Sequence, residues 1–279
     1  MREWRSEMIT ISLCMIVKNE ERILARCLDS VKDLVDEIII VDTGSADATK
    51  RIAAEYADKI YDFTWIDDFS AARNFAFSKA SKEYIYSADA DEVLSEENRQ
   101  RFRQLKETLL PEIEIVQMKY GNQLQNGTVY NFDEEYRPKL FRRLRNFVWE
   151  EPIHEMVRLA PVVYDSEIVI THMPEQNHAG RDLGNFRKQI AAGRQLSRRL
   201  YGMYARELFL AGSVQDLQEA ENYFRTEVSS PDRSTDEITE GCCVAAKAAR
   251  LRGDTVAFFK HTSKAVSYTQ PTLPTNSRV

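Results

Sequence analysis

Short apolar runs alternate with amphipathic segments through the first third of the chain. Residues 9–17, 38–41, 59–61 and 84–87 are rich in β-branched, apolar or aromatic side chains, and each run has the length of a strand. Between the first two runs, residues 23–34 place leucine, isoleucine and valine at helical spacing. Continuously apolar strands separated by helices are typical of a parallel sheet buried on both faces. The pattern therefore predicts an α/β fold with right-handed crossovers.

Polar side chains follow three of these strands at the point where each strand ends. Asn19 follows the first strand, Asp42 the second, and Asp89 and Asp91 the fourth. Ligands of open α/β sheets bind at the carboxyl ends of the strands. Residues i and i+2 of an extended segment point the same way, so Asp89 and Asp91 can reach one ion while Glu92 points to the opposite side.

The spacing of these carboxylates suits a metal ion that holds a diphosphate. Mg²⁺ and Mn²⁺ take oxygen ligands, usually one or two carboxylates together with substrate phosphates. A D-x-D tripeptide alone is better explained by a solvated acidic turn, because the tripeptide is common. Three polar clusters at one edge of one sheet favour the metal site over the turn.

The rest of the chain is first β-rich and then almost wholly helix-forming. A charged helix is expected over 95–110, and no β-rich run occurs between 185 and 266. Between these two regions the strand candidates are 114–120, 127–131, 137–141, 162–164 and 168–172, and the first two are expected to form a hairpin.

Two helical pairs within 185–266 resemble each other. One pair turns at Gly212 and the other at Gly253, with alanine and aromatic residues at similar places, which indicates a repeat near the tetratricopeptide period of about 34 residues. An ordinary helical extension explains the pattern equally well. Stacked helical pairs offer a concave surface, so we expect this region to hold the acceptor or, in a homodimer, a second subunit. Residues 267–279 are rich in Thr, Pro and Ser; we expect them to be disordered, and they resemble translated cloning-adapter sequence.

Composition and charge narrow the class of protein. The 279 residues suffice for one large domain, or for a domain with a small appendage. A net charge of −6 disfavours general nucleic-acid binding and attraction to anionic membranes. The apolar runs are too short to span a bilayer and residues 1–7 lack a signal-peptide core, so a cytoplasmic location is the default expectation. The four cysteines fit no zinc spacing and are expected to be reduced core residues.

Four segments in a fixed order carry a resemblance to a known family. They are SLCMIVKNEE, DEIIIVDTGSADAT, DDFSAARNFAF and YIYSADADE. In this order they resemble family 2 glycosyltransferases of the GT-A fold, in particular the branch with a helical, tetratricopeptide-like C-terminus that includes sublancin-type S-glycosyltransferases. The resemblance implies inverting transfer of a sugar from a nucleotide-sugar, usually a UDP-sugar, with Mg²⁺ or Mn²⁺. It also implies a GT-A domain over 9–175 and a helical region over 185–266, followed by the tail.

The resemblance assigns roles to matching positions. Asp42 matches the acid that recognises the nucleotide base, typically through the uracil N3–H. Asp89 and Asp91 match the metal-binding pair, with Asp91 as the direct ligand and a catalytic residue. The positions expected to bind the nucleotide-sugar are Val17, Lys18, Asn19, Glu20, Asp42, Thr43, Gly44, Ser45, Arg73, Asn74, Asp89 and Ala90.

A further family pattern, W-x-G-x-x-H-E, is kept in part. Trp149, His154 and Glu155 match it, but Glu151 stands where glycine is usual. We expect His154 to be a further metal or diphosphate ligand, and a hydrogen-bonded loop histidine is the alternative. His172 ends an apolar strand, where a structural histidine is favoured over a metal ligand.

The general base and the acceptor contacts are less constrained. Glu155 is the first choice for the base, followed by Glu150 and Asp133, and for each a solvated carboxylate explains the residue equally well. Trp65 and Trp149 suit stacking on a sugar or peptide, and core packing is the alternative. A basic strand edge is a more common explanation of Arg142, Arg143 and Arg145 than contact with the diphosphate.

Two other classes of function compete with glycosyl transfer. A nucleotidyltransferase also pairs an α/β fold with carboxylates and Mg²⁺, but it normally has a glycine-rich loop after the first strand, and residues 18–21 contain no glycine. A non-catalytic interaction protein would have no need for Asp42, Asp89 and Asp91 together. The sequence therefore favours a glycosyltransferase that acts on a soluble acceptor, with a peptide or protein side chain as one candidate.

Overall fold

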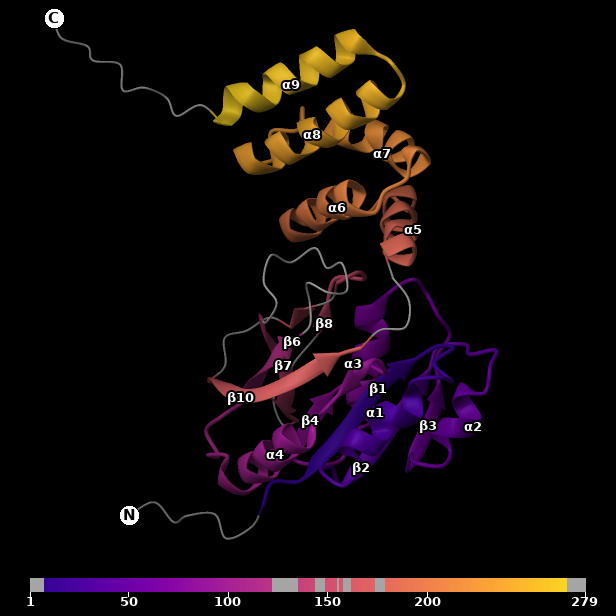
Figure 1. Cartoon of the computed structure of the whole chain (residues 1–279), viewed down its shortest axis with the longest axis vertical. Helices are drawn as coiled ribbons and strands as arrows, with labels where there is room; N and C mark the ends of the chain where they lie inside the picture. Colours follow the sequence, from indigo (N-terminus) through magenta and orange to yellow (C-terminus); the bar gives the residue numbers. More distant parts are fainter. Residues whose placement is uncertain are drawn as a thin grey trace, which may run out of the picture. The chain divides into compact units, whose positions relative to one another are not determined.

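The chain forms two compact units, residues 1–177 and 178–279, which we describe separately (Figure 1). The computed structural model describes residues 8–121, 135–143, 149–154, 156–157, 162–173 and 179–269. None of the helices in this described part is both long and apolar enough to cross a membrane.

The first unit is built on a mixed sheet of eight strands in the order β3-β2-β1-β4-β7-β6-β10-β5. The strands β1 to β4 form a parallel group, and β7 runs antiparallel to both β4 and β6. Strand β10 is parallel to β6 and antiparallel to the short β5. This arrangement confirms the predicted GT-A fold with a mostly parallel sheet. The strand bounds are β1 Ile11–Val17, β2 Glu37–Asp42, β3 Lys59–Asp62, β4 Tyr84–Ser87, β5 Glu92–Val93, β6 Ile115–Gly121, β7 Glu135–Arg142 and β10 Val163–His172.

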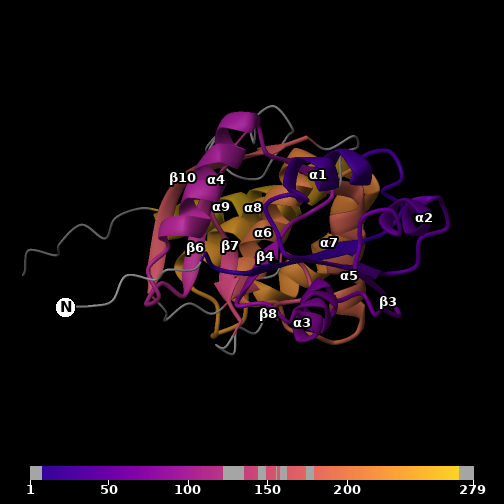
Figure 2. The ribbon, with the colours of Figure 1, turned by 90° about the horizontal axis from the view of Figure 1, so that it is seen from below.

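Helices cover both faces of this sheet. Figure 2 shows α1 and α4 on one side of the strands and α3 on the other. On the first side, Phe102 of α4 packs edge-on against Tyr86 of β4, with ring centroids 5.3 Å apart. On the second side, Phe77 of α3 meets Phe141 and Trp149. Burial on both faces explains why the strands are continuously apolar. The helices of this unit are α1 Leu24–Val31, α2 Thr49–Ala53, α3 Phe69–Lys79 and α4 Glu96–Thr108.

A two-stranded ladder, β8 Trp149–Glu150 with β9 Met156–Val157, stands apart from the main sheet. It brings the buried Trp149 against α3. The strand expected at 127–131 lies outside the described residues. Strand β5 was not expected, because two residues are too few to produce an alternating pattern.

The second unit is helical throughout its described residues, as the helix-forming composition predicts. Serines 197, 213 and 234 accept hydrogen bonds at the N-termini of three helices, and Gly253, with φ +80°, allows the turn between the last two. The rings of Tyr201 and Tyr204 pack against Phe224 across a helical pair. The helices are α5 Ala179–Ala191, α6 Arg198–Leu210, α7 Val214–Glu227, α8 Thr235–Leu251 and α9 Thr255–Thr269 (Figure 1).

The expected start of a non-helical tail at residue 267 is wrong by a few residues. Helix α9 continues to Thr269. The hydroxyl of Ser267 donates to the carbonyl oxygen of Lys264, one turn back, which lets a polar residue remain inside the helix. Residues 270–279 lie outside the described part.

Candidate functional site

The loops that follow β1 and β2 are joined by hydrogen bonds. The backbone N–H of Asn19 donates to Oγ of Ser45 at 2.9 Å, and Oδ1 of Asn19 accepts from the N–H of Ala46 at 2.8 Å. Asn19 has φ 57°, a left-handed conformation that asparagine tolerates better than most residues. Gly44, with φ 105°, supplies the turn that no other residue adopts easily.

The remaining expected nucleotide contacts of this region lie beside the two loops. The backbone N–H and the hydroxyl of Thr43 both donate to the carbonyl oxygen of Val17, and the N–H of Glu20 donates to Oγ1 of Thr49. Lys18 is exposed at the same edge. The two loops therefore form one polar rim at the carboxyl ends of adjacent parallel strands, Val17 lying opposite Asp42.

Asp42 presents a buried acceptor at this rim. Its Oδ1 accepts from the N–H groups of Gly44 and Ser45, both at 2.9 Å. Its Oδ2 is buried and has no hydrogen-bond partner among the described residues, and the whole residue is only 2% exposed. Buried carboxylate oxygens are nearly always paired, so an orphaned one indicates a missing donor. An imide N–H of a nucleotide base has the required chemistry.

Asp89 is held by protein cations. Arg73 of α3 donates from Nη1 to Oγ of Ser87 at 2.8 Å and from Nη2 to Oδ1 of Asp89 at 3.1 Å. Its guanidinium lies 4.6 Å from the centre of the Trp149 ring. Burial raises the pKa of Asp89, but the charges of Arg73 and Lys139 outweigh it and hold that pKa well below its usual range. Asp89 is therefore ionised at neutral pH.

Asp91 meets a histidine from a distant strand. Nε2 of His172 lies 3.0 Å from Oδ2 of Asp91, because β5 and β10 pair with Glu92 opposite His172. Oδ1 of Asp91 is buried and makes no hydrogen bond to any residue that the structure describes. The His172 ring also packs near Tyr120, at 5.2 Å between centroids. This contact supports the less favoured of the two expectations for His172, a metal ligand, because the histidine touches an acid that is expected to bind metal.

The donor set at this point fits a divalent cation. One carboxylate with an orphaned oxygen and one imidazole nitrogen are suitable ligands for Mn²⁺, and carboxylate oxygen also suits Mg²⁺. Ala90, between the two acids, is buried and carries no polar side chain into the site. Asp91 and His172 therefore offer ligand atoms that suit such an ion.

Glu92 lies beneath the two aspartates and is paired with a lysine. It is 2% exposed, and its Oε1 lies 2.5 Å from Nζ of Lys139 on β7. Burial raises the pKa of Glu92 to about 7, although the lysine acts in the opposite direction. Sequence reasoning missed Lys139, since no local pattern connects residues 47 positions apart.

Asn74 holds the backbone beside this site. Its Oδ1 accepts from the N–H of Trp149 at 2.8 Å, and its Nδ2 donates to the carbonyl oxygen of Trp149 at 2.9 Å. This pair of bonds fixes Trp149 below Arg73. In the same loop Glu151 and His154 have φ values of 68° and 48°. Glu151 thus adopts a left-handed conformation at the position where the family pattern has glycine.

Several other candidates lie elsewhere or outside the described residues. Trp65 is half-buried, with its ring against Phe69 and its Nε1 donating to Asp67. Arg142 lies opposite Tyr84, at the amino end of β4, and so at the other end of the strand from the acids. The residues that the structure does not describe are Glu155, Asp133 and Arg145, together with the side chain of Glu150.

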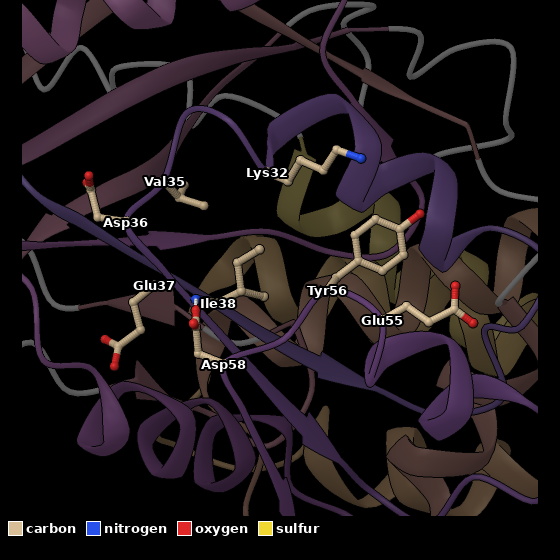
Figure 3. A pocket seen from close by; sticks show the side chains of 8 residues that line it. All are labelled: Lys32, Val35, Asp36, Glu37, Ile38, Glu55, Tyr56 and Asp58. Atoms are coloured by element: carbon tan, nitrogen blue, oxygen red, sulfur yellow. Dashed lines mark hydrogen bonds between the residues drawn. The ribbon is translucent and has the colours of Figure 1, made fainter.

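A hollow of about 620 Å³ lies at the amino-terminal edge of the sheet, away from this rim (Figure 3). Its acids serve the fold: Asp36 accepts from the N–H of Ile11, and Asp58 accepts from the N–H of Ile38. Glu37 accepts from Ser12, Lys59 and Ser81. Burial opposes ionisation of Glu37, but these hydrogen bonds lower its pKa to about 2. The acids that line this hollow therefore accept hydrogen bonds from the starts of strands, and we assign them a structural role rather than a second site.

Comparison with known proteins points to one family. The family model of glycosyl transferase family 2 matches residues 12–159. A TPR repeat-containing protein of Synechococcus elongatus is 40% identical over 150 residues, which cover 54% of this chain and 36% of that protein. The SPbeta prophage-derived glycosyltransferase SunS of Bacillus subtilis is 38% identical over 107 residues, covering 38% of this chain and 25% of that protein. The matches therefore span about a quarter to a third of these relatives.

A solved structure was also found. Glucosyl-3-phosphoglycerate synthase from Mycobacterium tuberculosis, in complex with Mn²⁺, UDP and glucosyl-3-phosphoglycerate, has 16% sequence identity and a TM-score of 0.46. The match covers 68% of this chain and 82% of that chain.

Proposed function

The chain belongs to glycosyl transferase family 2, and from this we propose that it is a metal-dependent, inverting glycosyltransferase with a UDP-sugar donor. The observation that carries the proposal is the pairing of Asp91 with His172 at a rim that also presents Asp42. Oδ1 of Asp91 and Oδ2 of Asp42 are both buried and both lack a hydrogen-bond partner in the described part of the chain. One orphaned oxygen suits a cation and the other suits a base N–H.

The nucleotide would be recognised at the ends of β1 and β2. Asp42 accepts from the imide N–H of uracil, while its other oxygen keeps the turn at Gly44 and Ser45 in place. Guanine also offers an imide N–H to a carboxylate, so GDP-sugars are the second donor class. Asn19 and the Ser45 loop then border the ribose, held in register by their mutual hydrogen bonds.

The chemistry would take place beside the acids. Asp91 and His172 would hold a divalent cation, which would supply positive charge to neutralise the leaving diphosphate. Arg73 and Lys139 keep Asp89 ionised and fixed in position. Inversion requires the acceptor to attack the anomeric carbon from the side opposite the diphosphate, with a base taking its proton. Glu155 remains our proposal for that base, and His154 for a further contact to the diphosphate or metal.

The acceptor proposal rests on the helical unit. Helical pairs offer extended surfaces that suit a peptide or protein substrate. Relatives of this chain include a TPR repeat-containing protein and a glycosyltransferase. We therefore propose a peptide or protein side chain as the acceptor, held by α5 to α9.

A donor screen tests the function. UDP-sugars and GDP-sugars are added with Mn²⁺, the shift in Tm is measured, and released products are then analysed. We expect a UDP-sugar to raise Tm more when Mn²⁺ is present than when it is absent, and slow hydrolysis to release UDP. Release of pyrophosphate instead would indicate a nucleotidyltransferase, and no binding of any donor would indicate an interaction protein. Asp91→Ala is the control and should abolish the Mn²⁺-dependent part of the shift and the release of UDP.

A further inference from the structure

Lys139 is a buried cation beside the acidic cluster, which consists of Asp89, Asp91 and Glu92. It comes from β7, and its side chain is only 6% exposed. Nζ lies 2.5 Å from Oε1 of Glu92, 3.9 Å from Oδ2 of Asp89 and 5.2 Å from the centre of the Tyr120 ring. Buried charges persist when they are paired, so the lysine is held by both acids at once.

The two aspartates of the cluster therefore have different electrostatic surroundings. Asp89 has Arg73 at one oxygen, 3.1 Å away, and Lys139 near the other. Asp91 has His172 at one oxygen, and its Oδ1 makes no hydrogen bond within the described residues. A cation that approaches Asp91 meets an acid pair whose charge is already partly balanced by Arg73 and Lys139. The attraction felt by a metal ion alone is reduced accordingly.

We propose that Lys139 is a positioning residue that holds Asp89 as an internal counter-ion and so makes metal binding depend on the diphosphate. This inference rests on the proposed function. A nucleotide diphosphate brings negative charge to the metal from the outside and offsets the repulsion from the ammonium. By the reciprocity of linked binding, the same ammonium strengthens the dependence of the nucleotide on the metal. Without Lys139 the acids would take up the ion on their own.

The test isolates the charge of Lys139 by making Glu92 neutral first. Removing one member of a buried ion pair leaves the other unpaired, which confuses the interpretation. Mn²⁺ affinity is therefore compared between Glu92→Gln, which keeps the ammonium, and the double variant Glu92→Gln with Lys139→Met, which removes it. Free Mn²⁺ is measured by electron paramagnetic resonance, with and without UDP, on the full chain. Glu92→Gln with Lys139→Gln repeats the comparison with a polar replacement.

We expect the double variants to bind Mn²⁺ without nucleotide at least about threefold more tightly than Glu92→Gln, because a like charge near the ion has been removed. The enhancement by UDP should fall by the same factor. A lysine with only a packing role predicts the opposite sign, since loosening the acids weakens metal binding. Equal or weaker Mn²⁺ binding in both double variants, with native circular dichroism, would therefore overturn the proposal.

A second lysine–glutamate pair supplies the control. Nζ of Lys119 on β6 lies 2.5 Å from Glu167, at an exposed position. Glu167→Gln, with and without Lys119→Met, should leave Mn²⁺ affinity unchanged.

Measurements on the wild type distinguish a failure of the proposed function from a misassignment of Lys139. If UDP and Mn²⁺ do not strengthen each other in the wild type, the proposed function fails and this inference with it. If they do, but the ammonium has no effect of the expected sign, Lys139 alone is misassigned.

Discussion

Nε2 of His172 lies 3.0 Å from Oδ2 of Asp91, although the two residues are 81 positions apart in the chain. The contact is fixed by the antiparallel ladder between β5 and β10, in which Thr171 faces Val93 and His172 faces Glu92. A backbone ladder holds both side chains without help from a ligand. The pair is therefore already in place for the role that we propose, one half of a metal site.

Replacing this histidine should weaken metal binding selectively. His172→Ala removes one nitrogen ligand while Asp91 remains, so we expect Mn²⁺ affinity in the presence of UDP to fall by about tenfold or more. UDP affinity measured without metal should be unchanged, which is an internal control for folding. Unchanged Mn²⁺ affinity would mean that His172 only orients Asp91.

Asp42→Asn should weaken binding of the nucleotide base. The asparagine oxygen can keep the two hydrogen bonds of the turn, and the amide nitrogen then replaces the orphaned Oδ2 with a donor. Losing a hydrogen bond to a charged acceptor costs about 1.5–3 kcal/mol, or roughly tenfold to a hundredfold in the Kd for UDP. Calorimetric titration of UDP measures this change, and an equal Tm for variant and wild type is the control. A Kd equal to that of the wild type would remove Asp42 from the site.

Glu37 should govern part of the acid stability of the first unit. Its folded-state pKa, about 2, lies below its usual value of 4.5, so its contribution is fully present above pH 4.5 and is lost as the pH falls toward 2. The shift corresponds to roughly 3 kcal/mol in the free energy of unfolding. Denaturant unfolding of wild type and Glu37→Gln should differ by about this amount at pH 7 and converge near pH 2. A difference for Glu37→Gln that does not change with pH would contradict the assignment.

The left-handed residue in the Trp149 loop gives a prediction about stability. Glu151 has φ 68°, a conformation that costs a residue with a Cβ about 1 kcal/mol or more relative to glycine. Glu151→Gly should therefore be more stable than Glu151→Ala by about 1 kcal/mol, both variants having lost the same carboxylate. Thermal or denaturant unfolding of the two variants checks this. An alanine variant as stable as the glycine variant would show that the loop adopts another conformation in solution.

The sheet and its polar rim follow from local patterns in the sequence. Runs such as 38–41 are apolar because both faces of the strand are covered, and a polar residue such as Asp42 marks the carboxyl end of the strand. Because β1, β2 and β4 run parallel, their carboxyl ends lie at one edge of the sheet. The proximity of Asn19, Asp42 and Asp89 can therefore be predicted from the order of strands and helices along the chain.

The contacts that distinguish the acids could not be predicted in this way. Lys139 meets Glu92, and His172 meets Asp91, in the half of the sheet where β7, β6, β10 and β5 follow one another out of chain order. The sequence around Lys139 or His172 does not indicate which strand the side chain will contact. The two-residue β5, which sets the Asp91–His172 contact, is too short for any periodicity to reveal.

The central claim, a metal site that binds a nucleotide diphosphate, is tested most directly by titrating UDP calorimetrically with and without Mn²⁺ in wild type and Asp91→Ala. We predict that Mn²⁺ tightens UDP binding in the wild type, and that the effect is weakened in Asp89→Ala and absent in Asp91→Ala, because Asp91 holds the ion that the diphosphate shares. UDP binding without metal should be similar in wild type and Asp91→Ala. A wild type whose UDP affinity does not respond to Mn²⁺, or an Asp91→Ala variant that keeps the full response, would contradict the assignment.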